Sequence, residues 1–429
     1  MFFHIHHNLN KILEILLGVC LAVFPVLILS SNKSGYPVLI LLLFSLVFLS
    51  FRKFVIKLDK SELSLLLVFT LYFCIAAISV LIYEGSIRDL DTPSRFLLVI
   101  PIYFLFKNIL INHRWLNYGI IFASLFIGVY EIIRTFVYPL DVLDNTGIST
   151  LYASILGIVS LFLISDKNHK ILNYFLFMGA FSGILASVFL GGRGVWIAGF
   201  FSMIVLIKLN LFDWSSKRRI ASLIFVMLIF AGGFLTERNF SIHLDGTESH
   251  LSSKIMETFS SIDYFKNEAQ DSDSTKKVND AVHSSVGERL EMWKASLFII
   301  KANYLFGVGE GNFNKHVTKL VESGLINPRV LRYSHPHNEY FSSMVEQGII
   351  GLMSLILVFS IPLIIVFKNL KKLSSYNDKN LQILIIAIVC HFSFYSLTSG
   401  VFDHQNTTLF YTFMIVVCIS LLKKISKNQ

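Results

Sequence analysis

Apolar residues gather into blocks of about 17–22 along this chain of 429 residues, and no other feature constrains the fold as strongly. Blocks of that length cross the ~30 Å hydrocarbon core of a bilayer as helices. Backbone groups in lipid must be satisfied internally, and the sequence lacks the alternating strands of a membrane barrel. It therefore predicts an all-α polytopic membrane protein with about twelve transmembrane helices, at 12–30, 36–51, 63–83, 95–112, 116–136, 148–166, 171–190, 194–211, 219–236, 349–368, 381–399 and 405–422.

One long hydrophilic segment, from about Thr236 to Gln347, interrupts the apolar blocks. It divides the chain into three predicted parts: helices one to nine in 1–236, a loop domain in 237–348, and helices ten to twelve with a tail in 349–429. Loops held on a rigid scaffold often carry function, so we expect the chemistry of this chain to lie in the insert.

Lysine and arginine gather in the loops on one side of the predicted membrane. By the positive-inside rule this side is cytoplasmic, which places both termini in the cytoplasm and the insert outside. The net charge of +9 is then mostly topological, and because the basic residues are dispersed we expect no nucleic-acid partner. The cytoplasmic loops and tail carry, among others, Arg52, Lys53, Lys57, Lys60, Lys107, Arg114, Lys167, Lys170, Lys217, Arg218, Arg219, Lys368, Lys371, Lys372, Lys423, Lys424 and Lys427.

The second half of the insert is predicted to hold two helices. A capping box over 285–288 precedes apolar residues at helical spacing, which predicts an amphipathic helix that ends near Asn303. A proline bars the residue before it from helical geometry, so a second helix is predicted to begin at His337 or Asn338 and to run to Gln347. The glycine that follows suits a helix end.

Three side chains on the predicted outer side have notable chemistry: Arg193, Arg289 and His337. Arg193 lies among three glycines at the head of a span, and Arg289 lies in a first helical turn, where the dipole disfavours a cation unless an anion is near. Guanidinium groups bind phosphate through paired hydrogen bonds, and a neutral histidine can take a proton from a hydroxyl. The helix dipole at the start of the second helix would favour that neutral form. This set predicts transfer from a phosphate-linked donor to a hydroxyl acceptor.

Each of these residues also has an ordinary structural explanation. An arginine at a span end commonly anchors the helix in the interface, and a loop histidine is commonly solvated. Two acidic pairs, Asp89/Asp91 and Asp271/Asp273, are better explained as solvated loop residues. Because no His/Cys/Asp cluster has metal-ligand spacing, we predict no metal and no cofactor, and the four cysteines lie in apolar spans where we expect no disulfide.

Three motifs make the chain resemble the O-antigen ligase family, within the wider group that includes O-antigen polymerases and bacterial O-oligosaccharyltransferases. They are GGRGVWIA at 191–198, GERLEMW at 287–293 running through FGVGEGNF at 306–313, and SHPHNEYF at 334–341 running through EQGIIGL at 346–352. The number of spans and the single long outer loop are similar too.

The resemblance implies a GT-C-like fold and an inverting, metal-independent glycosyl transfer at the periplasmic face of a bacterial inner membrane. The donor would be a glycan on undecaprenyl pyrophosphate, and the acceptor a sugar hydroxyl of lipid A–core. Carried over by motif, Arg193 and Arg289 would bind the pyrophosphate and stabilise the leaving charge, while His337 would orient or deprotonate the acceptor. Arg95 and Asn338 are expected as further substrate contacts.

The motifs do not choose among members of the wider group. An O-antigen polymerase, or an O-oligosaccharyltransferase that modifies proteins, could use the same residues. The ligase is favoured because the outer loop is moderate in size and brings no extra domain for a protein acceptor. A transporter is the alternative from another class, but it would usually show repeated halves and helices interrupted near the midplane.

Overall fold

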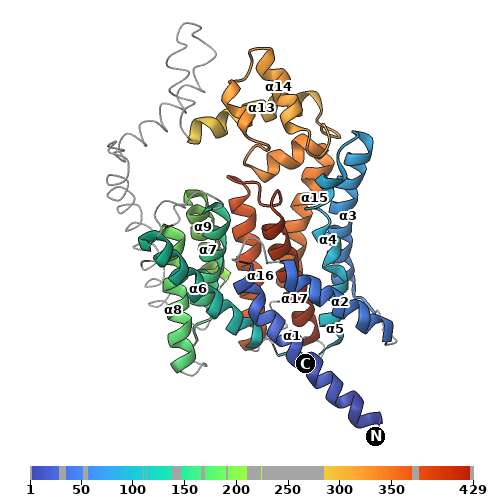
Figure 1. Cartoon of the computed structure of the whole chain (residues 1–429), viewed down its shortest axis with the longest axis vertical. Helices are drawn as coiled ribbons and strands as arrows, with labels where there is room; N and C mark the ends of the chain where they lie inside the picture. The colour runs from blue at the N-terminus through green and yellow to red at the C-terminus, as the bar shows by residue number, and fades with distance from the viewer. Residues whose placement is uncertain are drawn as a thin grey trace.

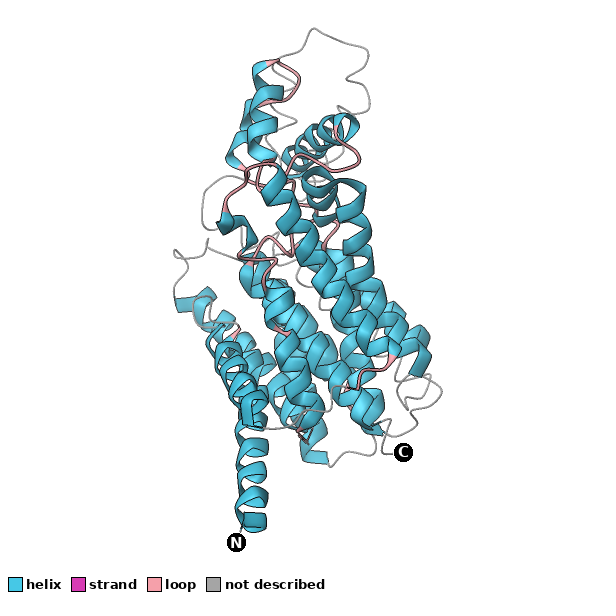
Figure 2. Cartoon of the chain, turned by 90° about the vertical axis from the view of Figure 1, so that its right-hand side faces the viewer, coloured by secondary structure: helices cyan, strands magenta, loops and turns pink. Residues whose placement is uncertain are grey.

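The computed structural model describes residues 2–28, 35–51, 57–109, 111–112, 114–137, 146–165, 170–189, 192–209, 224, 285–369 and 376–425. Every regular element among these residues is a helix. Figures 1 and 2 show long helices gathered into a bundle, with shorter helices at one end of it. The all-helical class predicted from the apolar blocks is confirmed.

The described helices follow the predicted apolar blocks. The blocks lie mostly in helix, the fourth of them in two separate helices, except for 219–236, which lies outside the described residues apart from Ile224. The α-helices of the bundle are α1 (Phe2–Leu27), α2 (Gly35–Phe51), α3 (Lys60–Ile82), α4 (Arg95–Leu98), α5 (Ile100–Asn108), α6 (Arg114–Val137), α7 (Thr146–Phe162), α8 (Lys170–Phe189), α9 (Arg193–Leu209), α15 (Glu339–Asn369), α16 (Tyr376–Tyr395) and α17 (Gln405–Ile425).

Length and composition identify the helices that can cross a membrane. Four described helices are long and apolar enough: Lys60–Ile82, Lys170–Val188, Glu339–Lys368 and Gln405–Lys424. Shorter apolar helices accompany them at Tyr36–Phe48, Ile148–Phe162, Gly194–Leu209 and Lys379–Tyr395. The chain therefore has the character of a membrane protein, while the count of twelve spans stays a prediction.

The fourth predicted block, 95–112, is not one continuous helix, and that expectation is wrong. Helix α4 ends at Leu98, and α5 begins at Ile100 with Pro101 in its first turn. Proline has no N–H to donate and is tolerated in the first turn of a helix, so it marks a new start. With 9 residues, α5 rises only about 14 Å, roughly half the thickness of a bilayer core.

Small residues let α6, α7 and α8 approach one another closely. A side chain on Gly157 of α7 or Gly183 of α8 would overlap backbone of the facing helix, so these two helices touch there. Ser124 of α6 donates from Oγ to the Gly179 carbonyl of α8 at 2.5 Å. Close approach through glycine and serine is how helices associate in lipid, where apolar burial gives little drive.

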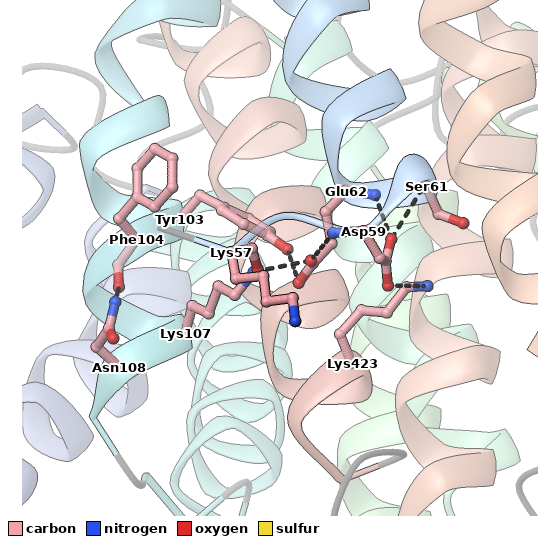
Figure 3. A network of polar contacts seen from close by, with 9 residues as sticks. All are labelled: Lys57, Asp59, Ser61, Glu62, Tyr103, Phe104, Lys107, Asn108 and Lys423. Carbon is pink, nitrogen blue, oxygen red and sulfur yellow. Dashed lines mark hydrogen bonds and ion pairs between the residues drawn. The ribbon is translucent and has the colours of Figure 1, made fainter. Parts of the chain in front are cut away.

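A buried carboxylate joins α3 to α5 at one end of the bundle (Figure 3). Glu62 of α3 accepts hydrogen bonds from Tyr103 Oη and Lys107 Nζ, both on α5 and both at 2.7 Å. Beside it, Lys423 of α17 donates to Asp59, the residue that caps α3, at 3.1 Å. The sequence predicts Lys107 and Lys423 on the same side of the membrane, and the structure brings both to this end.

The opposite end of the bundle carries a small helical group, defined as α13 (Ser285–Ala302), α14 (Phe313–Glu322), the 3-10 helix η2 (Pro328–Arg332) and residues 339–347 of α15. The predicted helix ending near Asn303 is confirmed as α13, whereas the sequence predicts neither α14 nor η2. The group encloses its own apolar core of Met292, Ala295, Ile299, Val308, Phe313, Val317, Ile326, Val330 and Val345.

Gly348 separates this group from the apolar part of α15. Its backbone leaves helical geometry at φ 65 and ψ −158, so the helix that begins at Glu339 is interrupted directly after Gln347. The predicted second helix and its glycine end are confirmed. The domain boundaries assigned from the sequence stay predictions.

Candidate active site

Segments from all three motifs meet at the turn 395–398, which ends α16 beneath the small helical group. Gly194 of α9 packs so closely on this turn that a side chain there would overlap the hydroxyl of its threonine. Asn338 donates from Nδ2 to the Leu397 carbonyl at 3.0 Å. The Arg289 guanidinium on α13 acts electrostatically on the tyrosine of the same turn. Residues that lie more than 140 positions apart in the sequence are thereby assembled around one point.

His337 lies in the loop before α15, in a left-handed backbone conformation with φ 52. Such a conformation is rare for a residue with a side chain and persists where the surroundings impose it. Here Trp293 of α13 donates from Nε1 to the Pro336 carbonyl at 3.0 Å. On the other side, Asn338 Oδ1 accepts the N–H groups of the first turn of α15, Tyr340 at 3.0 Å and Phe341 at 3.1 Å.

Two rings flank the His337 imidazole. The His335 ring centroid is 4.4 Å away, and the Tyr333 ring meets His337 edge-on at 5.1 Å. Burial, together with the positive charges of His335, Arg289 and His404, lowers the pKa of His337 to about 3. The sequence predicts a neutral imidazole because of the helix dipole. The structure places His337 before the helix and assigns the neutral form chiefly to burial.

A second group of polar residues lies near His337, and the sequence predicts no role for any of them. His335 Nδ1 lies 3.6 Å from Asp403 Oδ2, and the His335 ring lies 6.1 Å from that of His404. Burial lowers the pKa of His404, and the Asp403 charge opposes that shift. The repeated histidine in the His-Pro-His sequence was the one feature that could have marked His335 as a candidate. Asp403 and His404 lie in the loop before α17, where no sequence motif marks them.

Arg289 shares α13 with a buried carboxylate, Glu288. The capping box predicted at 285–288 depends on Ser285, whose side chain lies outside the described residues, so it stays a prediction. The Glu288 carboxylate accepts hydrogen bonds from Arg332 and Tyr333, and lies 3.6 Å from Arg329. Glu288 thus ties η2 and the ring that flanks His337 to the helix that carries Arg289. The guanidinium is half-buried beside the loop of His337, whose pKa it lowers.

Arg193 and Arg95 both lie at helix starts. Arg193 is the first residue of α9, between Gly192 and Gly194, and its side chain lies outside the described residues. Arg95 begins α4, and its Nη1 pairs with Asp91 Oδ1 at 2.7 Å. Asp91 also accepts a hydrogen bond from Gln405 at the start of α17, two residues after Asp403. Arg95 is therefore linked to the loop that contacts His335.

The weaker acidic candidates either have structural partners or lie outside the residues that the structure describes. Asp89 caps the 3-10 helix η1 (Ile87–Leu90), where its Oδ2 accepts the Ser86 N–H at 2.9 Å. Its partner in the motif, Asp91, is engaged by Arg95 and Gln405 as described above. The pair Asp271/Asp273 lies outside the described residues. Among the residues the structure describes, no three His, Cys, Asp or Glu side chains are grouped to hold a metal.

The glycine-rich turn 306–313 fastens the small helical group to α15. The N–H groups of Val308 and Gly309 donate to carbonyls of α15 at 2.8 and 2.9 Å, and the Gly311 N–H donates to Glu346 Oε1 at 3.1 Å. Within the turn, Glu310 accepts a hydrogen bond from Gln347 Nε2 at 2.6 Å. Burial raises the pKa of Glu310 to about 7, with the charges of nearby aspartates acting in the same direction.

These features define a class: an all-helical membrane protein with candidate histidine and arginine residues where its bundle meets a small helical group. A family model whose description reads O-Antigen ligase matches residues 178–356, a range that contains all three motifs. The resemblance drawn from the motifs is thereby confirmed: residues 178–356 of the chain match the O-antigen ligase family.

One curated relative matches along almost the whole chain. It comes from Haemophilus influenzae (strain ATCC 51907 / DSM 11121 / KW20 / Rd) and is described as an uncharacterized protein. The two sequences are 27% identical over 411 residues, which cover 93% of this chain and 96% of the relative. The family supports a function of the O-antigen ligase or polymerase type on lipid-linked glycans in a membrane.

Proposed function

We propose that this chain is an O-antigen ligase. It transfers an O-antigen glycan from undecaprenyl pyrophosphate to a sugar hydroxyl of lipid A–core, at the periplasmic face of a bacterial inner membrane. The observation that carries the proposal is the neutral imidazole of His337 beside the Arg289 guanidinium, where the three family motifs meet. A base for a hydroxyl and a cation for a phosphate are the two groups that such a transfer requires.

In the proposed reaction, the acceptor oxygen bonds to the anomeric carbon of the donor sugar as the bond from that carbon to pyrophosphate breaks. Attack on the face opposite the leaving group inverts the anomeric centre. The pyrophosphate departs with the electron pair, and Arg193 and Arg289 stabilise its growing charge. His337 receives the proton of the acceptor hydroxyl. The scheme needs no ATP, because the bond between the donor sugar and pyrophosphate is already activated. It needs no metal, because the two arginines stabilise the charge of the leaving group.

The low pKa of His337 fits this scheme if the donor binds first. A base is most effective when its pKa lies near the working pH, so an imidazole with a pKa of about 3 is a weak base in the unliganded protein. Arg289 is one of the charges that lower this pKa. A bound pyrophosphate would offset that charge and raise the pKa of His337, so donor binding prepares the base for the acceptor.

Arg95 and Asn338 have supporting roles in the proposal. Arg95 already holds Asp91 at 2.7 Å, so a phosphate or acceptor group would share its guanidinium with that carboxylate. Asn338 uses its side-chain oxygen to cap α15 and its nitrogen to hold the end of α16. It contributes to substrate binding mainly by fixing the loop that carries His337.

The test is transfer in vitro by the purified full chain, with lipid-linked glycan and lipid A–core, without ATP and with or without EDTA. Glycan on the core in both conditions supports the ligase. Longer lipid-linked chains beside unmodified core would assign the polymerase reaction instead. We expect His337→Ala and Arg289→Ala to lower turnover roughly 10²- to 10⁴-fold.

Two matched variants control for general damage to the outer side of the protein. His316 of α14 bonds to the Asn312 carbonyl of its own helix start at 3.1 Å, and Arg88 is exposed in η1. His316→Ala and Arg88→Ala should keep turnover within a few-fold of the parent, as substitutions at partly or fully exposed positions away from a site usually do. Equal losses in the control and test variants would refute the assigned roles of His337 and Arg289.

A further inference from the structure

Exposed apolar side chains form a stripe along the part of α15 that follows Gly348. At 1.5 Å per residue, the 19 residues of 349–367 span about 30 Å, the thickness of a bilayer core. If this segment spans the membrane, position 349 lies at one edge of the hydrocarbon and Lys368 just beyond the other. The members of the stripe recur at helical spacing, which assigns one face of the helix to lipid: Ile349, Ile350, Met353, Ile356, Ile364 and Phe367.

The segment that follows α13 touches this edge directly. The Ile349 N–H donates to the Tyr304 carbonyl at 2.8 Å. At Gly348, an added side chain would overlap the backbone of Leu305 and Phe306, so the two backbone segments are in direct contact. The side chains of Tyr304, Leu305 and Phe306 nevertheless remain 57%, 45% and 59% exposed. Three consecutive large side chains are thus open at the level where the apolar stripe begins.

The end of α13 extends the same surface. Leu297 and Phe298 are exposed apolar residues one to two turns before Tyr304. Lys301, which lies between Phe298 and Tyr304 in the sequence, is exposed as well. Leu297, Lys301 and Tyr304 follow the spacing of one helical face. A tyrosine and a lysine beside aliphatic and phenylalanine side chains is the composition of a membrane interface, where phenol and ammonium groups reach the headgroups.

We propose that the segment 297–306 is an interfacial anchor that rests on the lipid surface beside α15. Its apolar side chains enter the upper acyl region, while Tyr304 and Lys301 lie among the phosphates of the headgroups. The occupant is lipid rather than a protein partner, because the segment contacts α15 where the lipid-facing stripe begins, at Ile349, and adds a cation suited to phosphate. The anchor would hold the small helical group, and with it Arg289 and His337, at a fixed height above the bilayer.

The experiment places a photoreactive p-benzoylphenylalanine at one position of the full chain, reconstituted in vesicles of phosphatidylethanolamine and phosphatidylglycerol. Position Phe306 tests the anchor. Met353, on the stripe of α15, is the positive control. Leu325 is the negative control, because it is an exposed apolar residue just after α14, which lies beyond the end of the bundle in Figure 1. Covalent lipid adducts are counted by mass spectrometry of the peptide.

We expect lipid adducts at Phe306 at least half as abundant as at Met353 and about tenfold more abundant than at Leu325. An adduct yield at Phe306 no higher than at Leu325 overturns the proposal, as does crosslinking of Phe306 to a second copy or to another protein. The readout involves no glycan, so failure here leaves the proposed transfer reaction standing. Loss of transfer activity, in turn, would leave the anchor standing.

Discussion

At the scale of single residues, we expect binding of the donor to raise the pKa of the proposed base, His337. The charged and titratable groups named around His337 are Tyr333, His335, Arg289 and His404. A general base acts in its neutral form, so the rate of transfer falls as the pH drops through the pKa of the base. The profile of kcat/KM reports the free protein and that of kcat the complex. Because bound pyrophosphate would offset the charge of Arg289, we expect the acid limb of kcat at higher pH than that of kcat/KM. Limbs that coincide, or lie in reverse order, would contradict donor-assisted activation.

The half-buried carboxyl of Glu310 should make stability depend on pH. Its pKa is raised from an ordinary 4.5 to about 7, so the folded chain binds more protons than the unfolded chain between these values. The stabilising contribution is therefore present below pH 4.5 and is lost as pH rises through 7. We expect the melting temperature of the purified protein to fall between pH 5 and 8, and the fall to be smaller in Glu310→Gln. Glu322→Gln, at the exposed end of α14, should retain the full pH dependence, and an unchanged slope in Glu310→Gln would refute the assignment.

Residue chemistry identified Arg289 and His337 as candidates but not the groups around them. Arg289 was marked by an unfavourable position in a helix dipole, and His337 by its place at a predicted helix start. The partners of Glu288 are more than 40 positions away, and Asp403, which contacts His335, is separated from it in the sequence by α15 and α16. Such contacts depend on the packed chain, and no local spacing in the sequence encodes them. The Glu288 carboxylate is an example, since it binds a distant arginine and tyrosine.

At the scale of elements, apolar periodicity and glycine positions were reliable guides, while short polar helices were not. The break of α15 follows from a glycine at positive φ after a predicted helix. Helices α14 and η2 have 10 and 5 residues, and each is stabilised by packing around Phe313 and Val330 more than by its own sequence. The division of the fourth block at Pro101 was visible in the sequence, but the apolar run obscured it.

Gly348, at the junction between the small helical group and the apolar part of α15, should not tolerate a side chain. Alanine there would have to adopt φ 65 and overlap the backbone of Leu305 and Phe306. We expect Gly348→Ala to lower the free energy of unfolding by about 3 kcal/mol or more. Gly324→Ala is the matched control, because Gly324 has φ 75 but open space around it, so only the backbone term of roughly 1 kcal/mol applies.

Melting temperatures of both variants, measured in the same detergent, test this difference. A Gly348→Ala variant no less stable than Gly324→Ala would mean that the junction between the small helical group and α15 is loose. The interfacial anchor would then lose its geometric basis as well, since both depend on the same contact.

At the scale of the whole molecule, the two ends of the bundle are chemically distinct. One end gathers Lys107, Lys423 and the buried Glu62, while the other carries the small helical group with Arg289 and His337. Lipid-linked glycans and their acceptors meet at one face of a membrane, so the site can act on them only if that end faces them. The positive-inside rule assigns the lysine-rich end to the cytoplasm.

This assignment predicts how single cysteines will react with a membrane-impermeant maleimide in spheroplasts. Leu325→Cys, in the small helical group, should be labelled in intact spheroplasts, because that end faces outward. Lys60→Cys, at the exposed start of α3, should be labelled only after the membrane is permeabilised. The parent chain measures the background from its own cysteines. The reverse pattern would place His337 in the cytoplasm, where the proposed transfer could not occur, whereas the predicted pattern puts both lipid-linked substrates within reach of one site.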